Sequence, residues 1–408
     1  MNPIRQNPLL FPVYLPTIVL AFSRGMIIPV LPLYARSFGI SYTLVGLVLA
    51  GEGIGRLAGD VPAGFLLRRL GKKPVMLLGV STLLVSTIAL YWAQSPYEAL
   101  LYRFLTGLGD ALWHISRHAY LTQVTALYQR GRALSTFGGI NRIGTFAGPA
   151  IGGAVGALYG LRSPFLLYGG LAVIALAVAL RSIEAIDDPR DSLPGQGSSG
   201  IAGRLVTILR SHYRQLLTAG LGQLFGQMIR AGRPIIVPLF AADMLGLDLL
   251  AIGSIVSIAA FVDMSLFYVA GMIMDRLGRK YAIVPCFLVQ GIGMALIPFT
   301  GSYTGLLLAT CLMGLGNGLG AGSMMTLGAD LAPGESVGEF LGVWRLVGDG
   351  GSLGAPLVVG NVADALGLSA ATWAVAGVGV LASLTFAFLV PETLRRGRDH
   401  PEEGQDTT

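Results

Sequence analysis

Acidic side chains within long apolar runs are the residues of this sequence best suited to chemistry. Glu52 and Arg56 stand four residues apart and share one face of a helix. Asp110, His114 and Arg117 also share one helix face, because they are spaced at i, i+4 and i+7. Burial disfavours a charged carboxylate and a nearby cation favours it, so a carboxylate that alternates between these environments can take up and release a proton. Glu52 and Asp110 are therefore the leading candidates for proton coupling.

Several weaker candidates accompany these two acids. Asp60 ranks third, because it lies nearer a basic turn and can serve that turn instead. His114 titrates closest to neutral pH, yet a lone helical histidine is as often a packing residue. Cations of the same half complete the set: Arg24, Arg56, Arg117 and Arg142. The alternative is that each acid is permanently neutralised by an arginine and only holds helices in register.

Ionisable groups are costly inside a membrane and therefore indicate function. The second half of the chain has fewer of them, at Arg230, Arg233, Asp263, Arg345 and Asp349. The first half is therefore predicted to handle protons.

The composition places these residues in a bilayer. Hydrophobic residues make up 53% of the chain, charged residues only 12%, and the mean hydropathy is +0.68. A soluble protein has about a quarter charged residues. The net charge of +6 is not gathered on a polar domain, which excludes a nucleic-acid partner. Cys286 and Cys311 lie within apolar runs, so neither a disulfide framework nor a CxxC site is expected.

The sequence also lacks GxxxxGK[ST] and HExxH motifs. We therefore expect no nucleotide, metal or other cofactor and no enzymatic activity.

Apolar runs of about 20 residues, the length of a spanning helix, recur through the chain. They predict an all-α membrane protein with twelve transmembrane helices near 11–35, 43–67, 74–93, 97–125, 132–159, 164–182, 215–241, 249–273, 280–300, 304–330, 336–364 and 370–391. The first run is too long for a signal-peptide core and is expected to be retained. The predicted divisions are a six-helix bundle at 1–182, a cytoplasmic linker at 183–214, a second bundle at 215–391 and a tail at 392–408.

Basic residues gather in alternate loops, which the positive-inside rule assigns to the cytoplasm. These loops and the termini hold Arg5, Arg68, Arg69, Lys72, Lys73, Arg130, Arg132, Arg181, Arg190, Arg204, Arg210, Arg214, Arg276, Arg279, Lys280, Arg395, Arg396 and Arg398. The other set of loops holds only Arg36 and Arg162. Both termini are therefore predicted to be cytoplasmic.

An internal repeat relates the two predicted bundles. GFLLRRLGKK at 64–73 is echoed by GMIMDRLGRK at 271–280, an offset of 207 residues. The same offset places Gly107 on Gly314 and Pro149 on Pro356. Two parallel six-helix repeats of this kind form one class of transporter.

The later copy of the repeat resembles the signature G-x-x-x-D-R-x-G-R-R/K of the major facilitator superfamily. It matches at Gly271, Asp275, Arg276, Gly278, Arg279 and Lys280. The resemblance implies that this turn is a conformational latch, in which glycines permit a tight turn and close helix approach. The first copy keeps Gly64 and Gly71 but has Arg68 in place of the acid, so Asp60 is expected to compensate. The alternative is that both turns are merely cytoplasmic basic loops.

A second signature lies in the fifth run as GxxxGPxxGG, formed by Gly144, Gly148, Pro149, Gly152 and Gly153. Small residues at this spacing allow close helix packing, and proline bends the helix. The string resembles the motif of proton-driven drug antiporters in the superfamily. Arg103 and Gly107 resemble the arginine motif of the family's fourth helix. A purely structural role in helix packing is the alternative.

These resemblances predict proton-coupled efflux of amphipathic or lipophilic small molecules by alternating access. Proton-coupled uptake of a nutrient or organic anion is the alternative, because buried arginines suit anions. A receptor or scaffold that transports nothing leaves the intramembrane charges unexplained. The expected partners are a small-molecule substrate, protons and the lipid bilayer, with the protein a monomer. The expected location is a bacterial or archaeal inner or plasma membrane, crossed many times.

Overall fold

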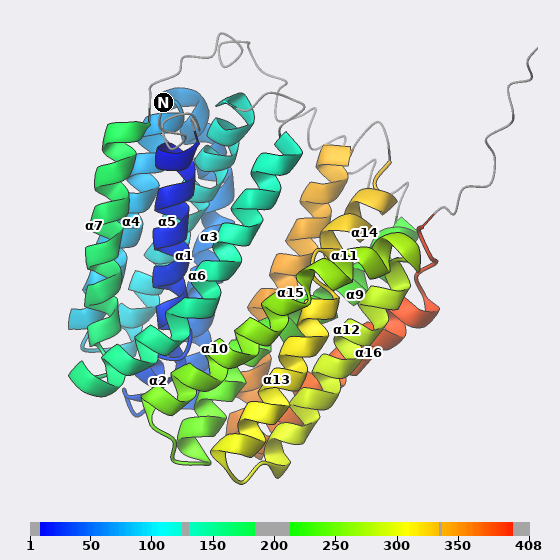
Figure 1. Ribbon diagram of the computed structural model, residues 1–408. Coiled ribbons are helices and arrows are strands. Elements are labelled where there is room, and N and C mark those ends of the chain that lie inside the picture. The colour runs from blue at the N-terminus through cyan, green and yellow to red at the C-terminus, as the bar shows by residue number, and fades with distance from the viewer. Residues whose placement is uncertain (1–8, 125–129, 184–212, 334–336, 395–408) are drawn as a thin grey trace, which may run out of the picture.

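The computed structural model describes residues 9–124, 130–183, 213–333 and 337–394, and within these ranges it contains helices and no strands. The helices form two groups that lie side by side (Figure 1). We call residues 9–183 the N-terminal half and residues 213–394 the C-terminal half. Much of the predicted linker and tail lies outside the described residues.

Helices occupy every apolar run expected from the sequence. Those of the N-terminal half are a π-helical turn Leu10–Tyr14, α1 (Leu15–Ile27), α2 (Leu31–Arg36), α3 (Tyr42–Leu70), α4 (Lys72–Trp92), α5 (Pro96–Val124), α6 (Arg130–Tyr159) and α7 (Ser163–Ser182). Those of the C-terminal half are α9 (Tyr213–Asp243), α10 (Leu249–Ser265), α11 (Phe267–Arg276), α12 (Arg279–Leu296), a 3-10 turn Ile297–Phe299, α13 (Tyr303–Leu319), α14 (Ser323–Leu331), α15 (Val337–Leu366) and α16 (Leu368–Phe388).

Local sequence explains where several of these helices begin and end. Pro29 follows α1 and separates it from α2, since proline cannot continue the backbone hydrogen-bond ladder. Gly322, with a φ of +78°, separates α13 from α14. Side chains of Ser41, Asp248 and Ser302 accept hydrogen bonds from the first turns of α3, α10 and α13. These caps allow the chain to reverse in short loops.

Seven helical stretches in the described ranges are long and apolar enough to cross a membrane: Leu10–Ile27, Lys72–Trp92, Ser163–Ser182, Leu249–Arg276, Arg279–Phe299, Tyr303–Leu331 and Leu368–Leu389. The other long helices, α3, α5, α6, α9 and α15, have 29 to 31 residues. They hold the candidate residues Glu52, Asp110, Arg142, Arg233 and Asp349. The polar helices are therefore the ones that position the candidate site.

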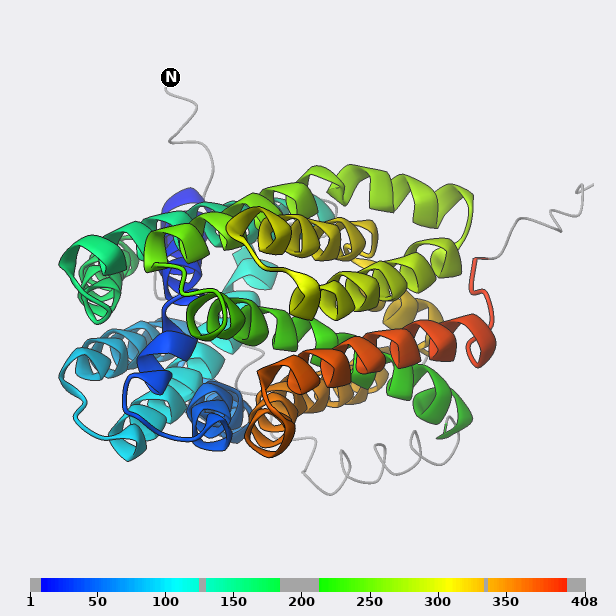
Figure 2. The same cartoon turned by 90° about the horizontal axis from the view of Figure 1, so that it is seen from below.

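The two halves contact each other at one end of the molecule, which we call the closed end. The Asp364 carboxylate of α15 accepts hydrogen bonds from the backbone N–H groups of Tyr42 and Thr43, at 2.8 Å each, and so caps α3 from the other half. Asp243 accepts a hydrogen bond of 2.6 Å from the Tyr42 hydroxyl and pairs with Arg36 at 3.4 Å. Figure 2 shows the helices from this end.

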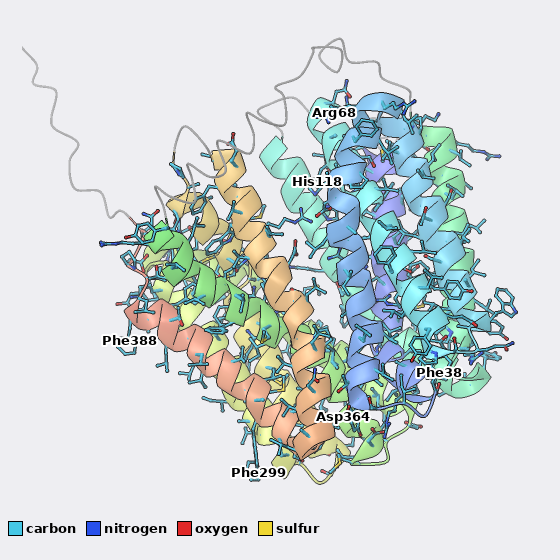
Figure 3. The ribbon with its side chains drawn as sticks, turned by 180° about the vertical axis from the view of Figure 1, so that it is seen from behind. Phe38, Arg68, His118, Phe299, Asp364 and Phe388 are labelled. Carbon is cyan, nitrogen blue, oxygen red and sulfur yellow. The ribbon has the colours of Figure 1, made fainter. Side chains whose placement is uncertain are left out.

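The opposite end of the molecule holds Arg68, and we call it the basic end. There the ribbons of α3 and α15 stand apart, whereas they converge near Asp364 (Figure 3). A cavity of about 700 Å³ lies between the halves, with walls that include His118 of α5, Gln223 of α9 and Arg345 of α15. In this conformation the halves are therefore closed at one end only.

Candidate functional site

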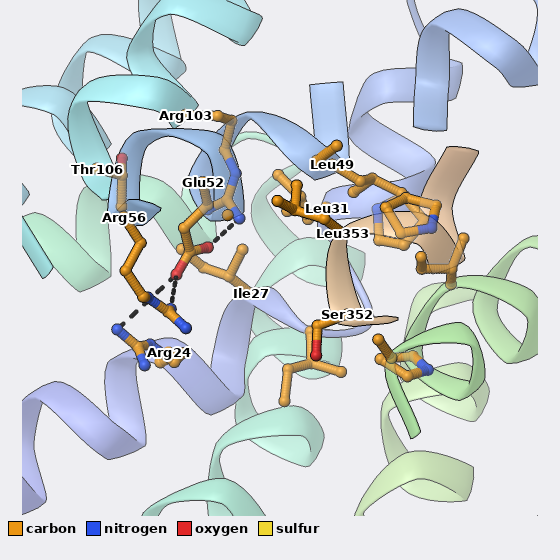
Figure 4. Close-up of a pocket in the computed structure, with 18 of the residues that line it drawn as sticks. Arg24, Ile27, Leu31, Leu49, Glu52, Arg56, Arg103, Thr106, Ser352 and Leu353 are labelled. Atoms are coloured by element: carbon orange, nitrogen blue, oxygen red, sulfur yellow. Dashed lines mark hydrogen bonds and ion pairs between the residues drawn. The ribbon is translucent and has the colours of Figure 1, made fainter. Parts of the chain in front are cut away.

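The predicted acid Glu52 lies in a network of arginines drawn from three helices (Figure 4). Its carboxylate forms an ion pair with Arg103 of α5 and accepts a hydrogen bond of 3.2 Å from Arg56, one turn along α3. Arg24 of α1 lies 3.8 Å from the same carboxylate. The Glu52 side chain is 16% exposed, so three guanidinium groups replace most of its water.

Asp110 of α5 is bound by two of the same arginines. Arg24 donates a hydrogen bond to its Oδ1 atom, and Arg56 Nε lies 2.8 Å from Oδ2. The Asp110 side chain is only 4% exposed. Arg24 and Arg56 therefore each contact both carboxylates, which joins Glu52 and Asp110 in one cluster. We call Arg24, Glu52, Arg56, Arg103 and Asp110 the charge network.

Glycines bring the backbones of α3 and α5 close enough for these contacts. A Cβ atom added to Gly107 would lie 2.7 Å from Arg56 N, and one added to Gly51 would lie 3.2 Å from Arg103 Cβ. A larger residue at either position would push the helices apart. The glycine pattern thus sets the spacing on which the ion pairs depend.

The charge network borders a cavity of about 370 Å³ between the two halves. Arg24, Glu52, Arg56 and Arg103 line one side, and Asp349, Ser352 and Leu353 of α15 line the other. Figure 4 shows Ser352 and Leu353 across the cavity from Glu52. Apolar side chains complete the wall: Ile27, Ile28, Leu31 and Leu49 among them. This first cavity can therefore hold an amphipathic molecule beside ionisable groups.

His114 and Arg117 lie at the margin of the charge network. Both line a cavity of about 200 Å³ together with Arg24 and Asp110. The His114 ring lies 4.8 Å from that of His118, and the Arg117 guanidinium lies 5.3 Å from the centre of the Trp113 ring. Their shared helix face was predicted from spacing, and the structure places that face beside Asp110.

Arg142 was predicted to belong to the N-terminal charged set, and this is not where it lies. Its Nη1 atom is 3.8 Å from Asp263 Oδ1 of α10, in the C-terminal half, and its guanidinium lies 4.7 Å from the centre of the Phe267 ring. The reason is geometric, because α6 packs along α10 and presents Arg142 to the other half. Arg142, Arg230, Arg233 and Asp263 line a second cavity of about 320 Å³.

Asp60 does not join the charge network. Among the described residues Asp60 makes no hydrogen bond or ion pair. No contact of this side chain therefore supports its predicted role in compensating for Arg68. Arg68 likewise has no such partner in the described part of the chain. A role of Asp60 and Arg68 in a latch stays a prediction.

The second basic turn is held by a set of contacts centred on Arg279. Its guanidinium pairs with Asp275 at 3.0 Å and with Asp330 of α14 at 2.9 Å. Arg276, which the signature also includes, has no hydrogen bond or ion pair with the described residues. Arg279 is therefore the structural centre of this turn.

Glu392, which follows α16, caps the start of α12. Its carboxylate accepts hydrogen bonds from the backbone N–H groups of Arg279 and Lys280, at 2.9 and 3.0 Å. Burial would raise the pKa of the Glu392 carboxyl, but these amides and those of Thr393 and Leu394 hold the pKa below its ordinary value of 4.5. The end of the chain's helical region is thereby tied to the second basic turn.

Of the glycines in the two turns, one pair has the expected backbone conformation and the other pair makes no close helix contact. Gly71 and Gly278 have φ angles of +83° and +130°, which side chains rarely adopt, so they do permit the turns. Gly64 and Gly271 were expected to allow close helix approach, but no atom lies within 4 Å of a Cβ built on either. That part of the prediction is wrong for this conformation, because both glycines face open space.

The GxxxGPxxGG string packs against two helices at once. A Cβ atom on Gly148 would lie 2.6 Å from the Gly25 backbone of α1, and Gly144 and Gly152 contact the same helix. Gly153 instead faces α10 of the other half, where a Cβ atom would lie 2.9 Å from Gly253 Cα. The close packing expected from this string is therefore present, both within and between halves.

A hydroxyl from α10 enters the backbone of α6 beside Pro149. The Ser257 Oγ atom accepts a hydrogen bond from Ala150 N–H and donates one to the Phe146 carbonyl, both at 2.8 Å. Ser257 thus satisfies both backbone groups from the opposite half.

Sequence reasoning did not place two residues that make contacts at this site. Arg103 was noted only for its motif, yet it stands seven residues before Asp110 and so on the same helix face, a spacing that would have placed it in the charge network. Ser257 gave no signal, because one serine in an apolar run is unremarkable. Within the described ranges, no group of three or more His, Cys, Asp or Glu side chains could hold a metal ion.

Two transporters of related sequence match most of the chain. A transporter of Methanocaldococcus jannaschii, described as an uncharacterized MFS-type transporter, is 21% identical over 373 residues, which cover 90% of this chain and 94% of that protein. Multidrug resistance protein 2 of Bacillus subtilis is 26% identical over 317 residues, or 76% and 77% of the two chains.

A crystal structure of the nucleoside transporter NupG has the same fold. It superposes with a TM-score of 0.75 at 14% identity and covers 94% of this chain and 100% of that one. The family model for the Major Facilitator Superfamily matches residues 13–264 and 219–407, which together span nearly the whole sequence. The chain belongs to the Major Facilitator Superfamily.

Proposed function

We propose that this transporter is a proton-coupled antiporter that exports amphipathic or lipophilic small molecules by alternating access. The observation that carries the proposal is the position of Glu52 and Asp110, two acids that share Arg24 and Arg56, with Glu52 and both arginines at the wall of a cavity between the halves. The likeness to a multidrug resistance protein of Bacillus subtilis supports export of such molecules.

The proposed coupling step is a change of partners within the charge network. When the acids are ionised, Arg24 and Arg56 are held between them. Protonation of either acid removes one side of this pairing, and an arginine between the halves that is left with one partner favours a rearrangement that restores its contacts. We propose that this difference biases the equilibrium between the conformation described here and one closed at the basic end.

The proposed architecture places both termini and the basic end in the cytoplasm, following the distribution of Lys and Arg. It counts twelve spanning helices, because α3, α5, α6, α9 and α15 are each long enough to cross a bilayer and bury their charges between the halves. In this arrangement the halves are six-helix units at 1–182 and 215–391, joined by a linker at 183–214 and followed by a tail at 392–408. The conformation described here would then be open to the cytoplasm. The proposed transporter is a monomer in the cell membrane.

The test follows the luminal pH of proteoliposomes preloaded with a compound and then diluted. An antiporter brings protons in as the compound leaves, so the lumen becomes acidic. Compound efflux that is indifferent to an imposed pH gradient and gives no luminal pH change would sink the proposal. Empty liposomes carrying the same compound correct for passive leakage.

Proton-coupled symport of an organic anion is the second candidate, and the excess of cavity arginines favours it. Three guanidinium groups face two carboxylates in the charge network, and three more face Asp263 in the second cavity. A symporter carries protons in the same direction as its substrate, so the lumen of the preloaded vesicles would become alkaline. The sign of the pH change therefore separates the two candidates.

A further inference from the structure

The second cavity holds more positive charge than its own residues neutralise. Arg142, Arg230 and Arg233 line it, and Asp263 is the one carboxylate among its lining residues. That carboxylate is already engaged, because Arg142 pairs with it at 3.8 Å and Asn317 donates a hydrogen bond of 2.6 Å to it. Two guanidinium groups are left over.

Arg230 and Arg233 have no carboxylate of their own. Arg230 donates to the Gly320 carbonyl at 3.2 Å and lies 5.1 Å from the centre of the Phe287 ring, while its Nε atom is buried without a hydrogen-bond partner. Arg233 makes no hydrogen bond or ion pair with any residue in the described ranges. Charged groups within a membrane are costly unless an opposite charge accompanies them, so this pair calls for an anion.

We propose that Arg230 and Arg233 bind the anionic head of an amphipathic substrate, with a sulfonate, carboxylate or phosphate group as the shared chemistry. The planar guanidinium group presents a fork of donors that matches such oxyanions. The inference rests on the proposed transport function and adds the charge of the substrate to it.

The apolar body of the substrate has a place next to this head group. The first and second cavities share Ile28 and Pro234, so they adjoin. Leu31, Leu49 and Leu353 make the wall of the first cavity largely apolar. A molecule with its head at Arg233 and its body against these leucines would contact both halves, as alternating access requires. Because the head lies apart from Glu52 and Asp110, the anion and the proton occupy separate groups.

Ligand charge is the first test. Binding of naphthalenesulfonate, its neutral sulfonamide and a naphthylmethyl trimethylammonium cation is measured by calorimetry on the full protein in phosphatidylcholine nanodiscs, with empty nanodiscs subtracted. We expect the sulfonate to bind about tenfold more tightly than the sulfonamide, and the cation more weakly still. Equal affinities, or tighter binding of the cation, would overturn the inference without any variant.

Substitutions then locate the anion. Arg233→Gln is expected to weaken sulfonate binding about tenfold and to leave the sulfonamide unchanged, and Arg233→Lys should recover part of the loss. Arg214→Gln is the matched control, because Arg214 is an exposed arginine near the start of the same helix α9. An equal loss in Arg214→Gln, or no loss in Arg233→Gln, contradicts the assignment to this cavity.

A lipid headgroup could supply the same chemistry, so the measurement is repeated with phosphatidylglycerol in the nanodiscs. An unchanged sulfonate affinity supports a soluble substrate. A large loss of sulfonate affinity in phosphatidylglycerol nanodiscs assigns the cavity to a lipid headgroup and overturns the inference of a soluble anionic substrate. Binding is measured without a gradient, so its failure is separate from failure of transport. Selective sulfonate binding without flux would defeat only the proposed function, and proton-linked flux of the cation without sulfonate binding would defeat only this inference.

Discussion

The Ser257 hydroxyl of α10 lies 2.8 Å from the backbone nitrogen of Ala150 in α6 and accepts its hydrogen bond. The same hydroxyl donates to the Phe146 carbonyl. One side chain of the C-terminal half therefore bonds to two backbone groups of the N-terminal half, next to Pro149. This contact can exist only while α6 and α10 are together, which makes it specific to the conformation of the two halves.

Removal of this hydroxyl should favour the other conformation. Ser257→Ala leaves the Ala150 N–H and Phe146 carbonyl without that partner, a loss of about 1 kcal/mol or a roughly fivefold shift in the equilibrium. Distances between spin labels at positions 37 and 366, one on each half at the closed end, would report a larger separated population. Ser254→Ala is the control, because Ser254 bonds to Tyr303 within the C-terminal half. An unchanged distance distribution in Ser257→Ala would contradict this role.

The glycine string should be intolerant of a single methyl group. Gly148→Ala places a Cβ atom 2.6 Å from the α1 backbone, so we expect a loss of about 1–3 kcal/mol in stability. Gly139→Ala on the same helix meets no atom within 4 Å and should be neutral or slightly stabilising. Thermal unfolding in detergent measures both variants. If both unfold at the wild-type temperature, the contact between α1 and α6 is not tight.

The two basic turns should respond differently to mutation. Asp275→Asn removes a partner of Arg279 and is expected to lower turnover roughly two- to fivefold, the scale of an exposed ion pair. Arg68→Asp should be tolerated, because Arg68 has no ion-pair partner among the described residues. Initial transport rates at matched protein abundance give the comparison. An equal loss in both variants argues against this asymmetry.

The Glu392 cap gives the stability of the transporter a defined pH dependence. Its folded-state pKa is below the ordinary value of 4.5, so the ionised group stabilises the protein above that pH and the contribution is lost as the pH falls further. We expect Glu392→Gln to unfold at a lower temperature than wild type at pH 7, with the difference shrinking as the pH falls below 4.5 and through the lowered pKa. A difference that persists unchanged at low pH would assign the effect to something other than this charge.

The helical arrangement was largely predictable from sequence, because apolar runs of spanning length and alternate basic loops are local patterns. The polar helix faces that carry Glu52 and Asp110 were predictable for the same reason, since each face is a pattern within one helix. Contacts between halves were not. Asp263 pairs with Arg142 and Ser257 bonds to Ala150 only through the way α6 crosses α10, and no spacing within one helix specifies a partner on another.

Proton movement in the Glu52→Gln, Asp110→Asn double variant tests the central claim most directly. Proteoliposomes are preloaded with naphthalenesulfonate or its trimethylammonium analogue, and luminal pH and compound efflux are recorded together on dilution. Wild-type protein should acidify the lumen as the compound leaves. The double variant should still exchange compound for compound while acidification is abolished. Acidification at the wild-type rate per transporter in the double variant would contradict the assignment of proton coupling to these two carboxylates.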